Sequence, residues 1–187
     1  MSAAPSWLRQ YLFRQDGMHA YVVLDGASVP DLPARLWELE PEHICLYRGE
    51  LEPDVAEVAP YLVELVDGSP FTQWLMASAW GEHWGTFLRA AGGLRMCRDH
   101  FRRLLMVRTE DSRFLYFAFY DPRVLRVFLP LCDQEQLEEM FGPVAEYLAE
   151  GEDPGEGKLF GFTAGKLVST TMGEATVAPE SAPTPTA

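Results

Sequence analysis

The residues that could do acid–base, metal or nucleophilic chemistry are few in this chain and lie far apart. The four histidines are His19, His43, His83 and His100. None of them falls at the HxH or HExxH spacing of metal ligands, and the three cysteines form no CxxC pair. No GxSxG sequence marks a nucleophile elbow. The sequence therefore predicts no metal site, no cofactor and no catalytic residue.

One glycine-rich segment, Gly151 to Lys158, has the outline of a phosphate-binding loop. Its spacing differs from GxxxxGK[ST], and Leu159 stands where a serine or threonine would hold magnesium. The carboxylates of Glu152 and Glu156 would also repel a phosphate group. We therefore do not expect this segment to bind a nucleotide.

Two aspartates follow predicted strands, which is where α/β proteins often place functional groups. Asp25 precedes Gly26 in a pair typical of a turn. Asp121 precedes Pro122, as an N-cap precedes the first residue of a helix. Local structure is the favoured interpretation of both aspartates. The alternative is a small α/β enzyme with a site near Asp25, Arg48 and Asp121.

A basic window interrupts an otherwise acidic protein. The formal net charge of −13 argues against a nucleic-acid surface and against anionic membranes, so we expect neither as a partner. Between Arg89 and Arg126, however, nine arginines stand against four carboxylates. The simpler interpretation is that these arginines are solvated or paired with acidic residues. The functional one is a recognition face for an acidic or carbonyl-rich protein segment.

The elements that must position these residues follow from apolar patterning. The run from Phe114 to Tyr120 predicts a strand buried on both faces, leading directly into the helix that begins at Asp121. Further strands are predicted at Ala20–Leu24, Ile44–Tyr47, Tyr61–Val66 and Thr86–Leu88. Because helical patterns separate these strands, we expect an α/β fold with a mixed or mostly parallel sheet covered by helices.

The strongest helical pattern runs from Leu94 to Met106. Its apolar stripe includes Cys97 and Phe101, whereas Arg95, Arg98, Arg102 and Arg103 occupy the other sides. If the sheet brings this helix and the one after Asp121 to the same side, their arginines border a common surface.

We expect one domain in three parts: an N-terminal helical segment at 1–18, the α/β domain at 19–166 and a disordered tail at 167–187. The tail lacks the apolar periodicity that offsets ordering entropy. No secretion signal and no apolar run long enough for a membrane span is visible, and the cysteines form no disulfide framework. These features favour a cytoplasmic protein.

Several short sequences, in a fixed order, also point to a known family. They are YVVLDGA from Tyr21, LYRG from Leu46, APYLVEL from Ala59, WGTFLR from Trp84, HFRRLLMV from His100, FAFYDPRVL from Phe117, FLP from Phe128 and FGP from Phe141. In their order and spacing the chain resembles the type VI secretion effector chaperone and adaptor family (the Tap or TEC proteins).

The resemblance implies a bacterial cytoplasmic chaperone without enzymatic activity. Such a protein holds a toxic effector and helps load it onto the secretion spike, so the cognate effector is the expected partner and the spike-tip protein a second candidate. An immunity protein that neutralises a toxin is a further alternative. The predicted partner-binding residues are Arg48, Trp84, Arg98, Arg102, Arg103, Arg123 and Arg126. The family-motif residues with a structural or binding role are Asp25, Gly26, Gly49, Asp121 and Pro122.

Overall fold

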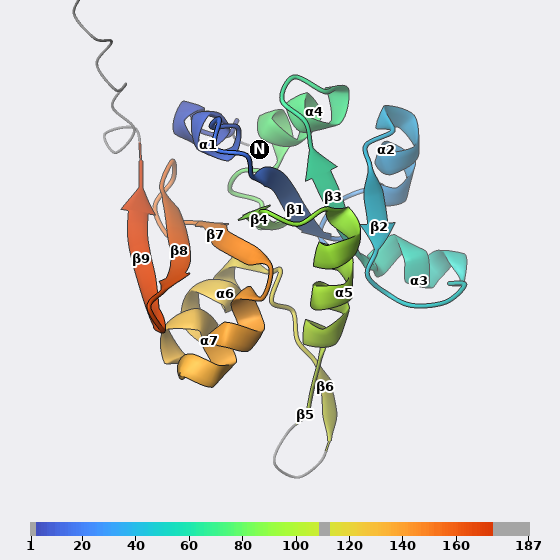
Figure 1. Ribbon diagram of the computed structural model, residues 1–187. Helices are drawn as coiled ribbons and strands as arrows, with labels where there is room; N and C mark the ends of the chain where they lie inside the picture. Colours follow the sequence, from blue (N-terminus) through green and yellow to red (C-terminus); the bar gives the residue numbers. More distant parts are fainter. Residues whose placement is uncertain (1–2, 109–112, 174–187) are drawn as a thin grey trace, which may run out of the picture.

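A seven-stranded sheet in the order β2-β3-β1-β4-β7-β8-β9 forms the centre of the molecule (Figure 1). The computed structural model describes residues 3–108 and 113–173. The strands of this sheet are β1 (His19–Asp25), β2 (His43–Cys45), β3 (Pro60–Leu65), β4 (Gly85–Ala90), β7 (Val144–Glu150), β8 (Gly157–Thr163) and β9 (Lys166–Met172). Each strand runs antiparallel to its neighbours.

The prediction of a mixed or mostly parallel sheet is therefore wrong. It rested on uninterrupted apolar runs, and β1 indeed buries every residue from Ala20 to Leu24. Such runs are typical of parallel strands because parallel sheets are covered on both faces. Here an antiparallel sheet is covered on both faces, and its central strands carry the same pattern. An apolar run thus indicates that both faces of a strand are buried. It does not indicate whether the strand pairs parallel or antiparallel with its neighbours.

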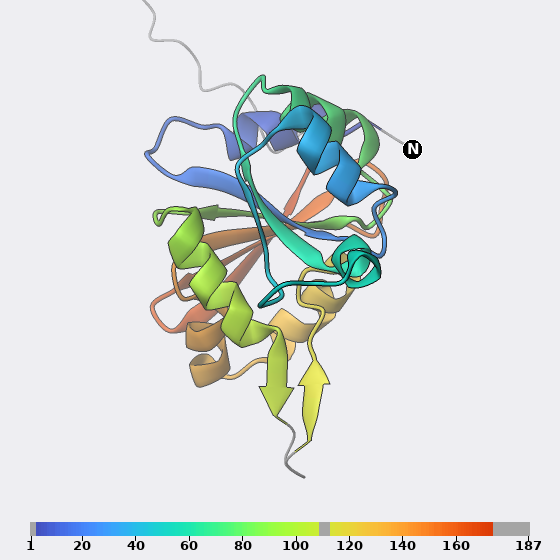
Figure 2. The same ribbon diagram turned by 90° about the vertical axis from the view of Figure 1, so that its right-hand side faces the viewer.

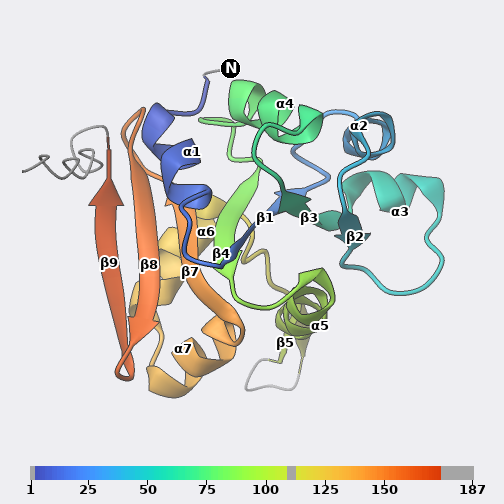
Figure 3. The same ribbon diagram turned by 45° about the horizontal axis from the view of Figure 1, so that its top comes forward.

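Helices form a layer on each face of the sheet (Figures 1 and 3). They are α1 (Ser6–Leu12), α2 (Leu32–Leu39), α3 (Pro53–Val58), α4 (Pro70–Ser78), α5 (Leu94–Leu104), α6 (Pro122–Phe128) and α7 (Gln134–Phe141), with a 3₁₀ turn at Leu129–Leu131. Helices α1, α2 and α4 pack on one face, and α5, α6 and α7 on the other. The helix at Leu94 and the helix after Asp121 therefore lie on the same face, which is the condition for their arginines to border a common surface.

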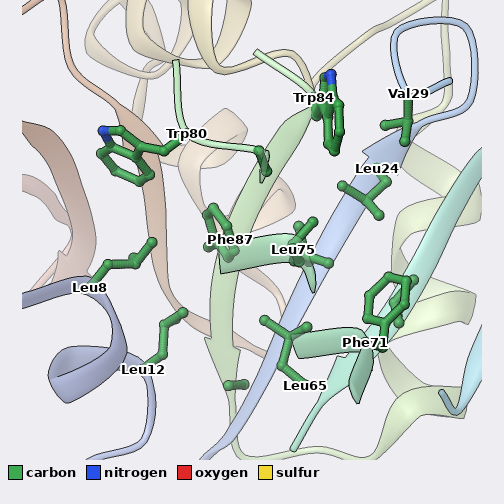
Figure 4. Packing of buried hydrophobic residues seen from close by; sticks show 14 of the residues in the cluster. Leu8, Leu12, Leu24, Val29, Leu65, Phe71, Leu75, Trp80, Trp84 and Phe87 are labelled. Carbon is green, nitrogen blue, oxygen red and sulfur yellow. The ribbon is translucent and has the colours of Figure 1, made fainter. Parts of the chain in front are cut away.

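Alternating residues of β1 supply the two halves of the core. Val22 and Leu24 belong to the cluster under α1, α2 and α4, whereas Tyr21 and Val23 belong to the cluster under α5, α6 and α7. Figure 4 shows the first cluster, in which Leu8 and Leu12 of α1 point toward the sheet beside Phe87 of β4. Both faces and both edges of β1 are thus covered, so β1 is an interior strand of the sheet.

The structure also corrects the expected boundary of the C-terminal tail. Residues from Lys166 to Met172 form strand β9, which pairs along its length with β8. Met172 is buried in the first core cluster, and Leu167 packs against the second. The expected disordered tail therefore cannot begin at 167, and residues 174–187 lie outside the described part of the chain.

A third correction concerns the run from Phe114 to Tyr120. Only Phe114–Tyr116 is a strand, β6, and it pairs with β5 (Met106–Arg108) in a separate two-stranded sheet. This hairpin projects from the body of the molecule below α5 (Figure 2). The following residues return to the core, where the Phe119 ring stacks on that of Phe101 with 5.2 Å between centroids. The prediction of one strand buried on both faces is wrong.

The predicted N-cap at Asp121 is confirmed, and other helices begin with side-chain caps of their own. The Asp121 carboxylate accepts a hydrogen bond from the Arg123 backbone N–H at 2.8 Å, and Pro122 follows as the first residue of α6. Asp133 and Gln136 form the reciprocal capping box at the start of α7. The Ser69 hydroxyl oxygen caps α4 by accepting a hydrogen bond from the Thr72 backbone N–H, without the reciprocal bond of a capping box. Asp31 precedes α2 but makes no side-chain cap hydrogen bond.

Candidate protein-binding surface

The β5–β6 hairpin exposes apolar side chains that a folded domain normally buries. Leu115 is 51% exposed and Tyr116 71% exposed, and Met106 and Val107 opposite them are also exposed. Scattered exposed apolar residues are ordinary, but a projecting group of them is typical of an interaction site. We name these four side chains and the two grooves at the base of the hairpin the hairpin surface.

The first groove, the α7 groove, lies between the hairpin, the end of α6 and α7. It has a volume of about 500 Å³. Its lining includes Leu104, Met106, Val107, Phe117, Phe128 and Met140 as apolar residues and Arg103, Gln136 and Glu139 as polar ones. An apolar floor with a cation and an anion on its walls suits an amphipathic protein segment.

The second groove, the α3 groove, lies on the other side of the hairpin and has a volume of about 410 Å³. Its lining is Leu46, Tyr47, Arg48, Leu51, Val55, Arg102, Leu105, Met106 and Tyr116. The Tyr47 and Tyr116 rings contact one another with 5.8 Å between centroids. Met106 contributes to both grooves, so the hairpin separates two apolar surfaces that share its first residue.

Two predicted partner-binding arginines border these grooves and are exposed. Arg103 lines the α7 groove and Arg48 lines the α3 groove. Neither side chain is buried, so each is accessible to a carboxylate or backbone carbonyl of a bound segment. The hairpin surface therefore combines exposed apolar residues with a guanidinium group on each side.

Arg102 also lines the α3 groove, but its guanidinium is occupied within the fold. Nη2 donates to the carbonyl oxygens of Cys45 at 2.9 Å and Tyr47 at 3.0 Å. Nε donates to that of Leu46 at 3.1 Å. These hydrogen bonds hold α5 against the end of β2 and the two residues that follow it. Arg102 thus positions the wall of the α3 groove instead of offering a free guanidinium.

Other arginines of the basic window are likewise held by intramolecular partners. Arg126 donates to the carbonyl oxygens of Glu150 and Gly151. Arg123 pairs with Asp121 at 2.7 Å, and Arg98 pairs with Asp99 at 2.8 Å. Arg123 lies in the first turn of α6, whereas the α7 groove receives Phe128 from its end. The arginines of α5 and α6 are therefore distributed over several places along their shared face.

Trp84 lies away from the arginines. It is 9% exposed and belongs to the core cluster under α1, α2 and α4, on the opposite face of the sheet from α5 and α6. Its ring packs against Trp74 with 5.6 Å between centroids, and Figure 4 shows it near Val29. The structure thus separates Trp84 from the hairpin surface.

The family-motif residues shape turns and helix starts. The Asp25 carboxylate accepts hydrogen bonds from the Ala27 N–H at 3.1 Å and from the Ser28 hydroxyl at 2.7 Å. Gly49 has a φ of +86°, a conformation that favours glycine. Gly26 approaches other backbone: a Cβ there would lie 2.5 Å from the carbonyl oxygen of Ala59. Asp121 and Pro122 begin α6 as described above.

Sequence reasoning missed the apolar residues of the hairpin. Leu115 and Tyr116 were assigned to a buried strand because they belong to the longest apolar run in the chain. The available signal was the polar sequence Arg108 to Arg113, which divides two short apolar segments as a hairpin loop does. The exposed apolar residues and Arg103 are near neighbours only because β5 continues from α5.

The described residues contain no group of three or more histidine, cysteine or acidic side chains arranged to hold a metal ion. All three cysteines are free thiols. Among the helices described, none is long and apolar enough to cross a bilayer.

These elements define a three-layer protein with helices on both faces of an antiparallel sheet and a projecting apolar hairpin. A family model described as "Domain of unknown function (DUF4123)" matches residues 20–139, and the chain belongs to this family. The match runs from β1 into α7 and includes every residue of the hairpin surface except Met140. No curated protein and no solved structure matches the chain.

Proposed function

We propose that this protein is a non-enzymatic chaperone and adaptor, which binds a type VI secretion effector in the cytoplasm and helps load it onto the secretion spike. The observation that carries this proposal is the hairpin surface, where Leu115 and Tyr116 are exposed between two grooves. Membership of the DUF4123 family and the sequence resemblance to effector adaptors support the same function.

The hairpin surface suits a protein segment better than a small molecule. Its two grooves lie on opposite sides of a projecting two-stranded sheet, so that a bound chain could contact both. Apolar side chains would supply most of the binding free energy, and Arg48 and Arg103 would fix the orientation of the bound segment. The cognate effector is the proposed ligand, and the spike-tip protein is a second proposed partner.

The alternative of an enzyme near Asp25, Arg48 and Asp121 has less support. The carboxylate of Asp25 is engaged in its own turn, and that of Asp121 caps α6 and pairs with Arg123. A general base needs a carboxylate that can reach a substrate. We therefore propose binding, not catalysis, as the function of this chain.

The test is co-purification of the full chain with the product of the neighbouring gene. Leu115→Asp places a charge on the hairpin surface and should weaken capture at least about ten-fold. Val168→Asp is the matched control, because Val168 is equally exposed at 51% but lies on β9. Both variants should keep the circular-dichroism melt of the unchanged protein. Equal capture by the two variants would remove the hairpin from the proposal, and no capture by the unchanged protein would overturn the binding function.

A toxicity-protection assay separates the chaperone from the immunity alternative. Cells that produce the active effector together with this protein should accumulate more soluble effector and remain sensitive to it. Survival of those cells would instead favour an immunity protein. The same assay with Arg103→Glu tests whether the α7 groove takes part, since charge reversal there should lower the amount of soluble effector.

A further inference from the structure

A second exposed apolar surface lies at the β2 edge of the sheet, beside α2 and α3. Trp37 of α2 is 85% exposed, whereas Leu32 and Leu36 of the same helix are buried. Tryptophan buries a large area when bound and is over-represented among residues that dominate binding. A tryptophan on the outer face of a helix contributes little to the core of its own domain.

The face that bears Trp37 adjoins a groove between α2 and α3. Ala34 lies one turn before Trp37 on the same side of α2 and lines this groove, which has a volume of about 460 Å³. Val58, at the end of α3, lines it from the other side and is 48% exposed. No side chain of α3 is buried, so the helix adds apolar contacts to the surface without packing into the core.

The charge around this apolar surface is strongly negative. Residues 30–58 carry eight carboxylates and two arginines, and all eight carboxylates belong to exposed residues. Arg35 is paired with Glu38 at 2.9 Å, and Arg48 faces the α3 groove instead. Asp31 and Glu57 stand directly on the lining of the α2–α3 groove. A segment bound in this groove would meet two carboxylates on its lining and further exposed carboxylates on the same stretch of chain.

We propose that Trp37, Ala34 and Val58 form a docking site for a basic amphipathic segment of a partner protein. Its apolar residues would cover Trp37 and the groove, and its lysines or arginines would face the surrounding carboxylates. A second copy of this chain is a poor occupant, because a net charge of −13 makes two copies repel each other. This site is separate from the hairpin surface and does not depend on the function proposed for it.

The first experiment uses the full chain and a short fluorescent peptide with leucines at helical spacing and lysines at the other positions. Fluorescence anisotropy should detect binding, and Trp37→Ala should weaken it at least about ten-fold. Leu131→Ala is the control, since Leu131 is 78% exposed in the 3₁₀ turn that follows α6, outside residues 30–58. A peptide with glutamates in place of the lysines should not bind. Equal binding by the two variants, or binding of the glutamate peptide, would overturn the proposal.

The second experiment distinguishes a local site from attraction by net charge alone. Glu57→Lys and Glu152→Lys change the net charge equally, but only Glu57 lines the α2–α3 groove. Glu57→Lys should weaken the lysine peptide at least about five-fold more than Glu152→Lys does. Equal effects would overturn the site. The last experiment is analytical sedimentation of the chain alone. If the chain forms a dimer that Trp37→Ala converts to monomer, a second copy of the chain is the occupant, and the proposal of a basic partner is refuted.

Discussion

Arg89 and Glu146 face each other across neighbouring strands, and Arg89 is only 1% exposed. They are register partners on β4 and β7, with 3.3 Å between Nη1 and the Glu146 carboxylate. Asp16 pairs with the same guanidinium, and Arg14 with both carboxylates. The hydrogen bond from Arg89 lowers the pKa of Asp16, so this pair stabilises the fold at neutral pH and weakens as acid protonates the Asp16 carboxylate.

Removing Arg89 should therefore be costly. Arg89→Ala leaves two carboxylates with only Arg14 as a partner and opens space inside the sheet, so we expect a loss of about 3 kcal/mol. Arg123→Ala is the comparison, because Arg123 belongs to an ion pair in which its side chain is 58% exposed. That pair should contribute less than about 1 kcal/mol. Urea unfolding measures both, and similar losses would contradict this account.

The buried His100 predicts how stability depends on pH. Burial is the main cause that lowers its pKa below the usual 6.5, with Arg103 adding to the effect, while its Nε2 lies 3.0 Å from the Met140 carbonyl oxygen. The native state therefore keeps the imidazole neutral where the unfolded chain already binds a proton. Stability is full above about pH 6.5 and is lost as pH falls toward the native pKa.

His100→Gln keeps a hydrogen-bond donor for Met140 but cannot titrate. The loss of unfolding free energy between about pH 7.5 and about pH 5.5 should be smaller in this variant than in the unchanged protein. An unchanged loss in His100→Gln would show that other groups set the pH dependence.

Two glycines of the family motifs should differ in their tolerance of alanine. A Cβ at Gly26 would lie 2.5 Å from the carbonyl oxygens of both Ala59 and Glu57, so backbone must move. We expect Gly26→Ala to cost about 2 to 3 kcal/mol. At Gly49 the added atom meets nothing within 4 Å, and only the positive φ of +86° opposes it. Gly49→Ala should cost about 1 kcal/mol, and thermal melts should rank the two accordingly.

Deleting residues 168–187 should lower the stability of the protein. The deletion removes most of β9 and takes Met172, which is 4% exposed, out of the core. We expect the melting temperature to fall by about 5 °C or more. Deleting only 174–187 leaves β9 complete, so the difference between the two truncations isolates the strand. Equal melting temperatures would mean that β9 contributes nothing to stability.

The sequence predicted features that depend on neighbouring residues and failed where distant ones decide. The cap at Asp121 needs only a residue two positions away, and it was predicted. Strand β9 was missed because five of its seven residues are exposed and its apolar residues, Leu167, Val168 and Met172, do not alternate along the strand. An edge strand with a solvent-exposed face shows little apolar periodicity from which it could be predicted.

The candidate site shows the same limit. Arg102 and Arg103 are adjacent in sequence and equally basic, yet one binds carbonyl oxygens more than 50 residues away and the other lines an open groove. Helical periodicity predicts the side of α5 on which each of the two arginines lies. It does not predict which part of the fold that side faces. The exposure of Leu115 and Tyr116 was hidden for a similar reason, since composition alone cannot separate an apolar strand that is buried from one that projects.

The contact between Trp7 and Gly155 has a consequence for the newly made chain. The Trp7 indole N–H donates to the Gly155 carbonyl oxygen at 2.9 Å, across a separation of 148 residues. A ribosome releases Trp7 long before that acceptor exists, and the open edge of β4 likewise waits for β7. The hydrophobic face of α1 is therefore not fully packed until strands β7, β8 and β9 have left the exit tunnel. Helix α1 can contact Trp80 early, but its packing is completed only after Gly155 has been translated.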